Sequence, residues 1–386
     1  MSKRYYWFLI IFLGVLTAFG PFVTDMCLPT LPAMADVFNT TTSAVQMGLT
    51  TSMLGLAIGQ LIFGPLSDKY GRKKLLLYAL LLYAFSTIAC IYSTTIEMFN
   101  ICRFVQGLGA AGGIVLSRSI STDSFTGRDL AKAFVIIGAV NGVAPVSAPV
   151  IGGLVASSVG WKGIFWILFG LGALLLTMCS VYNETLPVEK RSRGSLLSLM
   201  SSFSKLLHIK YYVIYVLISG FANGILFAYI SSASFIIQNH YGYSELFFSI
   251  VFGINAVGIG LGSALTLKFK KMINAALFGA CGCTALSLLQ FVNYFAFGGG
   301  FYIFETLIFF TMLCLGFILS SSTTLAMEEG RSYTGAASAL FGAVGFTFGA
   351  FVSPLVGIGN IMTSTFTTLT VTALVALVLS LVARRR

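Results

Sequence analysis

The amino-acid sequence predicts an all-α membrane protein of twelve transmembrane helices, arranged as two bundles of six. Three observations lead to this prediction. The chain is 57% hydrophobic and only 9% charged, whereas a soluble domain carries about 25% charged residues. Apolar runs of about 20 residues, long enough to cross a ~30 Å hydrocarbon core, recur along the whole chain. Lysine and arginine gather in alternate connections between these runs, as they do in multi-pass membrane proteins.

The predicted helices follow the apolar runs. The first run comes after Lys3 and Arg4, as in a signal peptide, but it is longer and lacks a small-residue cleavage site. We therefore interpret it as the first helix. The twelve runs cover approximately residues 6–27, 45–66, 75–92, 99–119, 131–157, 163–183, 211–236, 245–267, 273–293, 301–324, 335–357 and 363–383.

Positive charge sets the expected orientation. The connections after even-numbered runs and both ends of the chain are basic, whereas the connections after odd-numbered runs carry only Lys162. Because positive loops stay in the cytoplasm, we expect a multi-pass protein of the inner (cytoplasmic) membrane, surrounded by lipid, with both termini cytoplasmic. These loops account for the net charge of +11, so we expect no binding of nucleic acid.

The longest polar stretch divides the chain into two similar halves. We expect an N-terminal six-helix bundle over residues 1–185, a cytoplasmic central loop over 186–209 and a C-terminal six-helix bundle over 210–386. Two bundles joined in this way are typical of transporters. The cysteines and histidines show no ligand or disulfide spacing, and no Walker A sequence is present. We therefore expect no metal, cofactor, nucleotide or enzymatic activity.

The connection between the second and third runs carries the most specific motif, GPLSDKYGRKK, which starts at Gly64. It resembles the G-x-L-x-D-x-x-G-R-[KR]-[KR] signature of the major facilitator superfamily, which implies that superfamily's fold of two pseudo-symmetric bundles. A loop that only sets orientation would need positive charge, but not an aspartate and a glycine at fixed offsets. Asp68 ends its helix, where the helix dipole disfavours an anion, so it should pair with a cation or with the N-terminus of another helix. The resemblance implies a cytoplasmic gating motif of Gly64, Asp68, Gly71, Arg72 and Asp123.

Two further helices carry motifs of the same superfamily. In the fourth run, Arg103, Gln106 and Gly107 resemble its R-x-x-Q-G element. A charged residue inside a membrane helix costs at least ~2.5 kcal/mol, so Arg103 should face a cavity and a partner. The alternative is an arginine that reaches to the outer surface. The fifth run resembles the G-P-x-x-G-G element of antiporters, with Ala148 replacing its first glycine; this antiporter motif comprises Gly142, Pro145, Pro149, Gly152 and Gly153. A kinked packing helix would show much of the same pattern.

Other segments are similar to the bicyclomycin-resistance (Bcr/CflA) drug exporters of the superfamily. They are D-M-x-L-P-x-L-P from Asp25, R-x4-D-S-F-T-G from Arg118, and G-A-A-S-A from Gly335. Asp25 is the most deeply placed carboxylate of the sequence, and burial disfavours a charged carboxylate. We therefore expect Asp25 and Arg103 to couple transport to protons. The alternative for Asp25 is an acid in the outer headgroup layer, which is also how we interpret Glu245 and Glu305.

The resemblance implies export of small, partly apolar drugs in exchange for protons, by a chain that works as a monomer. We expect a substrate cavity lined by Asp25, Arg103, Gln106, Asn141, Asn223 and Phe227. An alternative is a proton-coupled importer of a sugar or other metabolite, although a sugar site would need more polar side chains than these runs hold. A third is the membrane subunit of an ATP-driven pump or a receptor, which the loop motif disfavours.

Overall fold

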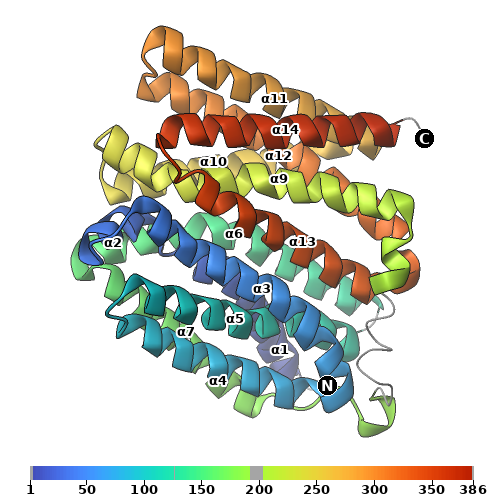
Figure 1. Cartoon of the computed structure of the whole chain (residues 1–386). Helices are drawn as coiled ribbons and strands as arrows, with labels where there is room; N and C mark the ends of the chain where they lie inside the picture. The colour runs from blue at the N-terminus through green and yellow to red at the C-terminus, as the bar shows by residue number, and fades with distance from the viewer. Residues whose placement is uncertain (1–2, 126, 192–202, 385–386) are drawn as a thin grey trace. The chain divides into compact units, whose positions relative to one another are not determined.

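The computed structural model of the chain is built of helices (Figure 1). It describes residues 3–125, 127–191 and 203–384, apart from side chains at 127, 128, 130–139, 141, 142, 146, 190, 297, 332, 334 and 335. Within these residues no β-strand occurs. The all-α prediction is therefore confirmed.

Twelve described helices have 20 residues or more, which is the number expected from the apolar runs. Several extend beyond those runs, because polar residues at the ends continue the helix. The long helices are α1 (Lys3–Asp25), α3 (Thr42–Tyr70), α4 (Arg72–Ile91), α5 (Ile96–Ser124), α6 (Gly127–Val159), α7 (Trp161–Val181), α9 (Lys210–Phe235), α10 (Glu245–Leu265), α11 (Met272–Phe297), α12 (Phe301–Glu329), α13 (Thr334–Leu355) and α14 (Ile361–Arg384).

These helices are suited to a membrane. Eleven helical segments among the described residues are long and apolar enough to cross one, and part of α6, Val143–Val159, is a shorter apolar helix. In a bilayer every backbone polar group must be satisfied within the protein, which a helix achieves alone. The chain is thus a multi-pass membrane protein.

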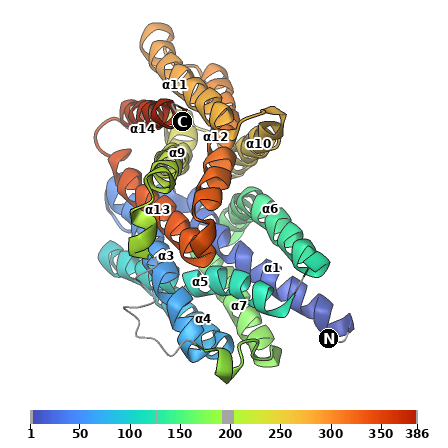
Figure 2. The same ribbon diagram turned by 90° about the vertical axis from the view of Figure 1, so that its right-hand side faces the viewer.

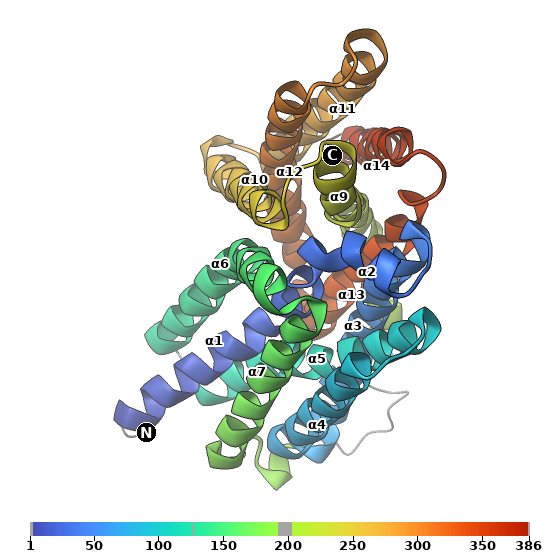
Figure 3. The same ribbon diagram turned by 90° about the vertical axis from the view of Figure 1, so that its left-hand side faces the viewer.

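The helices group into two compact units, each described here by itself. Unit 1 comprises Met1–Cys27 and Thr51–Ser201, and unit 2 comprises Leu28–Thr50 and Ser202–Arg386. In unit 1, α1 packs against α5 and α6, and α4 packs against α5 and α7 (Figures 2 and 3). In unit 2, α12 packs against α9, α10 and α11, and α9 packs against α13 and α14.

Residues 28–50 lie in unit 2, although they precede most of unit 1 in sequence. They form the short helices η1 (Leu28–Thr30) and α2 (Leu31–Val37) and the beginning of α3. Two glutamines hold them there. The buried Gln46 donates from Nε2 to Ser231 O at 2.8 Å, and the half-buried Gln238 donates from Nε2 to Pro29 O at 2.9 Å. The units therefore differ at 28–50 from the bundles expected over 1–185 and 210–386, whose boundaries remain a prediction.

The end of α9 is irregular. Its last turn continues as a π-helix, η3 (Ile236–His240), in which Tyr241 N donates to Ile236 O at 3.1 Å. The remaining short helices are the 3₁₀ turns η2 (Val188–Lys190), η4 (Thr266–Lys268) and η5 (Arg331–Tyr333). A π turn is wider than an α turn and often occurs at functional sites.

Candidate functional site

Arg103 of α5 is one of the largest fully buried side chains in the described part of unit 1, with 1% of its surface exposed. Its Nη1 donates to Gln106 Oε1 at 2.6 Å, and its Nη2 donates to Val23 O at 2.9 Å. Its guanidinium carbon also lies 5.7 Å from the centre of the Phe165 ring. Val23 O is among the last carbonyls of α1, which lack partners within the helix, so Arg103 places a cation at the negative end of α1.

Asp25, the last residue of α1, lies beside this arginine. It is 5% exposed, and its Oδ1 is buried without a hydrogen-bond partner among the described residues. The charge of Arg103 acts on the carboxyl, yet no ion pair within 4.0 Å joins the two in the described part of the chain. An unpaired buried carboxylate is costly. The carboxyl thus lies close to a buried cation without an ion pair to it, and its role in proton coupling remains a prediction.

A chain of polar side chains extends from Arg103 across the unit. Gln106 Nε2 donates to Thr87 Oγ1 at 2.8 Å, and Thr87 Oγ1 donates to Tyr83 O at 2.7 Å. Tyr83 in turn donates to Leu168 O at 3.2 Å. The sequence singled out Gln106 by its motif, but not Thr87 or Tyr83, because nothing in their own segment indicates which helix they contact.

The antiporter motif of α6 packs against the end of α1. A Cβ at Gly152 would lie 2.0 Å from Met26 O, so only glycine permits this approach. Met26 directly follows Asp25, and the glycine therefore fixes the backbone beside the candidate proton site. Pro149, one turn earlier in α6, is buried. The surroundings of Asn141 and Gly142 lie outside the described part of the structure.

Asn223 and Phe227 lie one turn apart on α9, in unit 2. Asn223 Nδ2 donates to Ser219 O at 2.8 Å. A Cβ at Gly345 would lie 3.1 Å from Asn223 Nδ2, and one at Gly349 would lie 2.3 Å from the Phe227 ring. Both side chains thus pack towards α13 in this unit, and their role in a substrate cavity remains a prediction.

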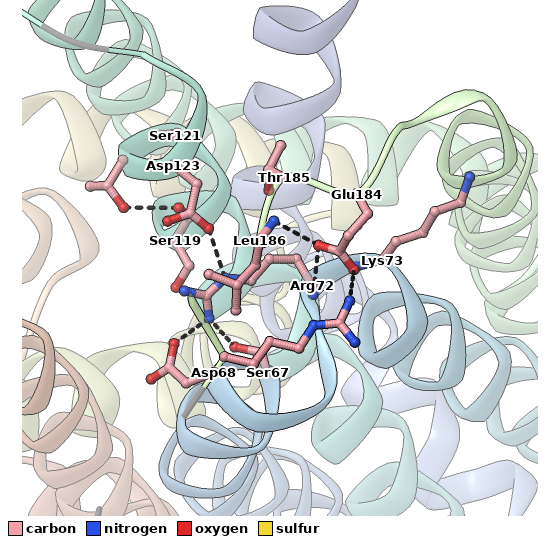
Figure 4. Close-up of polar contacts among 12 residues, drawn as sticks. Ser67, Asp68, Arg72, Lys73, Ser119, Ser121, Asp123, Glu184, Thr185 and Leu186 are labelled. Atoms are coloured by element: carbon pink, nitrogen blue, oxygen red, sulfur yellow. Dashed lines mark hydrogen bonds and ion pairs between the residues drawn. The ribbon is translucent and has the colours of Figure 1, made fainter. Parts of the chain in front are cut away.

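The loop motif forms a compact network in unit 1 around Arg72, whose side chain is 8% exposed (Figure 4). The guanidinium contacts three acceptors. Its Nη1 donates to Asp68 Oδ1 and to Ser67 Oγ, both at 2.5 Å, and its Nε donates to Asp123 Oδ2 at 2.9 Å. The expected pairing of Arg72 with Asp68 and Asp123 is therefore present, and it joins the end of α3 to the end of α5.

Glu184 is a member of this network that the sequence analysis missed. Its two carboxylate oxygens accept from the first amides of α4: Oε1 from Arg72 N at 3.0 Å and Oε2 from Lys73 N at 3.1 Å. Gly71, at the N-cap position, has no side chain for this purpose and adopts φ 96°, a conformation that favours glycine. A Cβ at Gly71 would also lie 2.6 Å from Glu184 Oε2. Gly64 is different, since a Cβ there would meet nothing closer than 3.6 Å.

We expect Glu184→Ala to destabilise the protein modestly. Loss of a helix cap costs about 1 kcal/mol, which lowers the melting temperature of a domain of this size by ~2–4 °C. The melting temperature of the detergent-solubilised protein measures the effect. Glu189→Ala is the matched control, because Glu189 is exposed in the same segment. Equal melting temperatures for the two variants would contradict the capping role.

Apolar helices that enclose a buried arginine and a buried carboxyl, with a charged network between the ends of α3 and α5, are features of a multi-pass membrane transporter. The chain belongs to the Major Facilitator Superfamily, which it matches over residues 10–354. This confirms the family indicated by the loop motif and the fold that it implies.

Two relatives span nearly the whole chain. The uncharacterized MFS-type transporter YdgK of Bacillus subtilis (strain 168) is 39% identical over 357 residues, which cover 90% of this chain and 88% of YdgK. A bicyclomycin resistance protein homolog of Haemophilus influenzae is 29% identical, again over 90% of this chain and 88% of the relative. The expected similarity to drug-resistance transporters is confirmed.

Solved structures agree on the fold. A bacterial homolog of the human lysosomal transporter Spinster superposes with a TM-score of 0.76 at 16% identity, covering 100% of this chain and 98% of the other. At this identity the likeness concerns the fold alone. Members of this family move small molecules across membranes, and this chain is therefore a transporter.

Proposed function

We propose that this protein exports small, partly apolar compounds in exchange for protons, by alternating access. The observation that carries the proposal is the buried Asp25 carboxyl, whose Oδ1 has no hydrogen-bond partner among the described residues, close to the buried cation Arg103. The relative named as a bicyclomycin resistance protein homolog supports drugs as the substrate class.

The coupling follows from the charge of this pair. While Asp25 is ionised, its negative charge compensates the positive charge of Arg103, and the attraction between the two keeps the end of α1 close to α5. When a proton binds to Asp25, the positive charge of Arg103 is no longer compensated, and the affinity of the surrounding site for substrate changes. One proton entering down a 100 mV potential supplies ~2.3 kcal/mol, enough for a drug concentration ratio of about 50-fold.

The other motifs have supporting roles in this proposal. The network of Asp68, Arg72 and Asp123, with Gly64 and Gly71, would stabilise the cytoplasmic end of unit 1. Close packing at Gly152 would transmit movement of α6 to the backbone beside Asp25. Asp25, Arg103, Gln106, Asn141, Asn223 and Phe227 would line the substrate cavity.

The placement of the chain is part of the same proposal. The basic connections orient it in the inner membrane with both termini in the cytoplasm. Bundles over 1–185 and 210–386 would move against each other around the central loop 186–209, and a single chain would suffice for transport.

Inside-out membrane vesicles with an acidified interior test the proposal. Adding bicyclomycin outside should raise the internal pH, because each exported drug molecule is exchanged for a proton. A pH-sensitive dye records the change, and vesicles from cells without the protein are the control. An unchanged internal pH would contradict the antiport of this drug, and acidification would indicate a symporter, as expected of an importer running in reverse.

A further inference from the structure

Unit 2 contains a half-buried glutamate, Glu305, of which one carboxyl oxygen, Oε2, is fully buried. Glu305 lies near the start of α12, and its Oε1 accepts a hydrogen bond from Asn255 Nδ2 of α10 at 2.5 Å. The same amide nitrogen donates to the Tyr229 hydroxyl of α9 at 2.8 Å. Tyr229 is 3% exposed and Asn255 is fully buried. The carboxyl is therefore held at a meeting point of three packed helices.

The charge of an ionised Glu305 would be poorly compensated. Its Oε2 is buried and has no hydrogen-bond partner among the described residues, and the same is true of Asn255 Oδ1. In the described part of the chain no lysine, arginine or histidine acts on the carboxyl or pairs with it. Unit 1 has Arg103 for Asp25, but Glu305 has only one amide donor. An isolated buried carboxylate tends to bind a proton and become neutral.

The neighbouring titratable groups do not change this conclusion. Tyr229 faces Glu305 from α9, and Tyr241 faces it from the turn after η3. Burial raises the pKa of Tyr241 to about 12, with the nearby Tyr294 of α11 and Glu305 adding to the effect. The Tyr241 hydroxyl donates to Gly299 O at 2.5 Å. A tyrosine carries no positive charge in either protonation state, so these side chains do not compensate the charge of Glu305.

We propose that Glu305 is a proton-binding site of unit 2, separate from Asp25, which holds a proton at neutral pH and exchanges it during the transport cycle. The Asn255 amide suits both states. It donates to Glu305 Oε1 in the structure, which suits the ionised carboxylate, and after a half-turn its oxygen can accept from the protonated acid and from Tyr229. Exchange of the proton during the cycle rests on the proton antiport proposed above, whereas its binding at neutral pH does not.

Labelling with dicyclohexylcarbodiimide tests the binding, because the O–H group of a protonated carboxyl adds across a C=N bond of this reagent and the product remains attached to the side chain. The full-length protein in proteoliposomes is labelled at several pH values, and the modified peptides are identified by mass spectrometry. An ordinary glutamate has a pKa of about 4.3, so at pH 7 only ~1 in 500 carries a proton. We expect Glu305 to be labelled at least ~10-fold more at pH 7 than such a group.

Glu97 is the internal control, because it is an exposed glutamate in the first turn of α5. Labelling is repeated in the Asp25→Asn variant, so that the Glu305 peptide is scored without competition from Asp25. Equal labelling of Glu305 and Glu97 at pH 7 would overturn the proposal. This measurement does not depend on transport, so it decides the proton site even if the wild-type protein fails to exchange drug for protons.

The transport role is tested with Glu305→Gln, which preserves shape and the acceptor for Asn255. If one proton per cycle is lost, the steady-state drug ratio at 100 mV should fall by about 50-fold. Glu97→Gln should leave the ratio unchanged. A Glu305→Gln protein that builds the same ratio as the wild type would refute the exchange step, while a wild type that builds no ratio would refute the antiport itself.

Discussion

Asp25→Asn is expected to abolish drug-driven proton movement while the protein still folds in the membrane. Asparagine has nearly the shape of aspartate, but it cannot bind and release a proton in the relevant range. The side chain next to Arg103 would be permanently neutral, and the energetic difference between the protonated and ionised states would disappear. Without this change of charge transport itself should stop, so that no proton is exchanged at Glu305 either, and we expect complete loss of the internal pH change in inside-out vesicles.

The exposed Asp36 of α2 provides the matched control, since Asp36→Asn removes the same charge from an exposed position. That variant should exchange drug for protons at the wild-type rate. Fluorescence-detected size-exclusion chromatography checks that both variants are folded. Asp25 would not be the coupling group if its asparagine variant still exported drug against a gradient that protonophores collapse.

Arg103→Met is expected to have the second largest effect. It removes the hydrogen bonds that the arginine donates to Val23 O and Gln106 Oε1, and it removes the cation beside Asp25. A hydrogen bond to a charged group contributes about 1.5–3 kcal/mol, so loss of transition-state stabilisation should slow transport by about 10- to 100-fold. The initial rate of drug uptake into inside-out vesicles measures this change.

Arg103→Lys separates charge from geometry. Lysine keeps the cation but replaces the planar fork of donors by a single ammonium group. It should therefore retain more activity than the methionine variant and less than the wild type. Equal rates for lysine and methionine would mean that the contacts to Val23 and Gln106 matter and the charge does not. A methionine variant as fast as the wild type would exclude Arg103 from the mechanism.

Much of the fold follows from properties that the sequence carries locally. An apolar run about as long as the bilayer is thick predicts a helix with little regard to its neighbours, and all twelve long helices were found in this way. The ends were less predictable. α3 and α12 continue to Tyr70 and Glu329, beyond the apolar runs, because polar residues at a helix end cost nothing where water or other partners are available.

The site was predictable where a motif places complementary charges close in sequence, as for Asp68 and Arg72. It was not predictable where the partner comes from a distant segment. Glu184 caps α4 from more than a hundred residues away, in a stretch that reads as an ordinary polar loop. Glu305 was assigned to the outer headgroup layer from its position near the start of an apolar run, and nothing in that run indicates its contact with Asn255, because this contact depends on how α10 packs against α12.

The π turn at Ile236–His240 has the geometry of an α-helix that has accommodated one inserted residue. The wider turn takes up this extra residue, so the residues after it are rotated by about 100° relative to a regular α-helix of the same sequence. Gln238 in the turn contacts Pro29, and Tyr241 directly after it donates to Gly299 O. A regular α-helix through the same residues would point these side chains elsewhere. A regular helix and these two long-range contacts therefore exclude each other at this position. The wider turn allows the end of one helix to contact both η1 and the connection between α11 and α12.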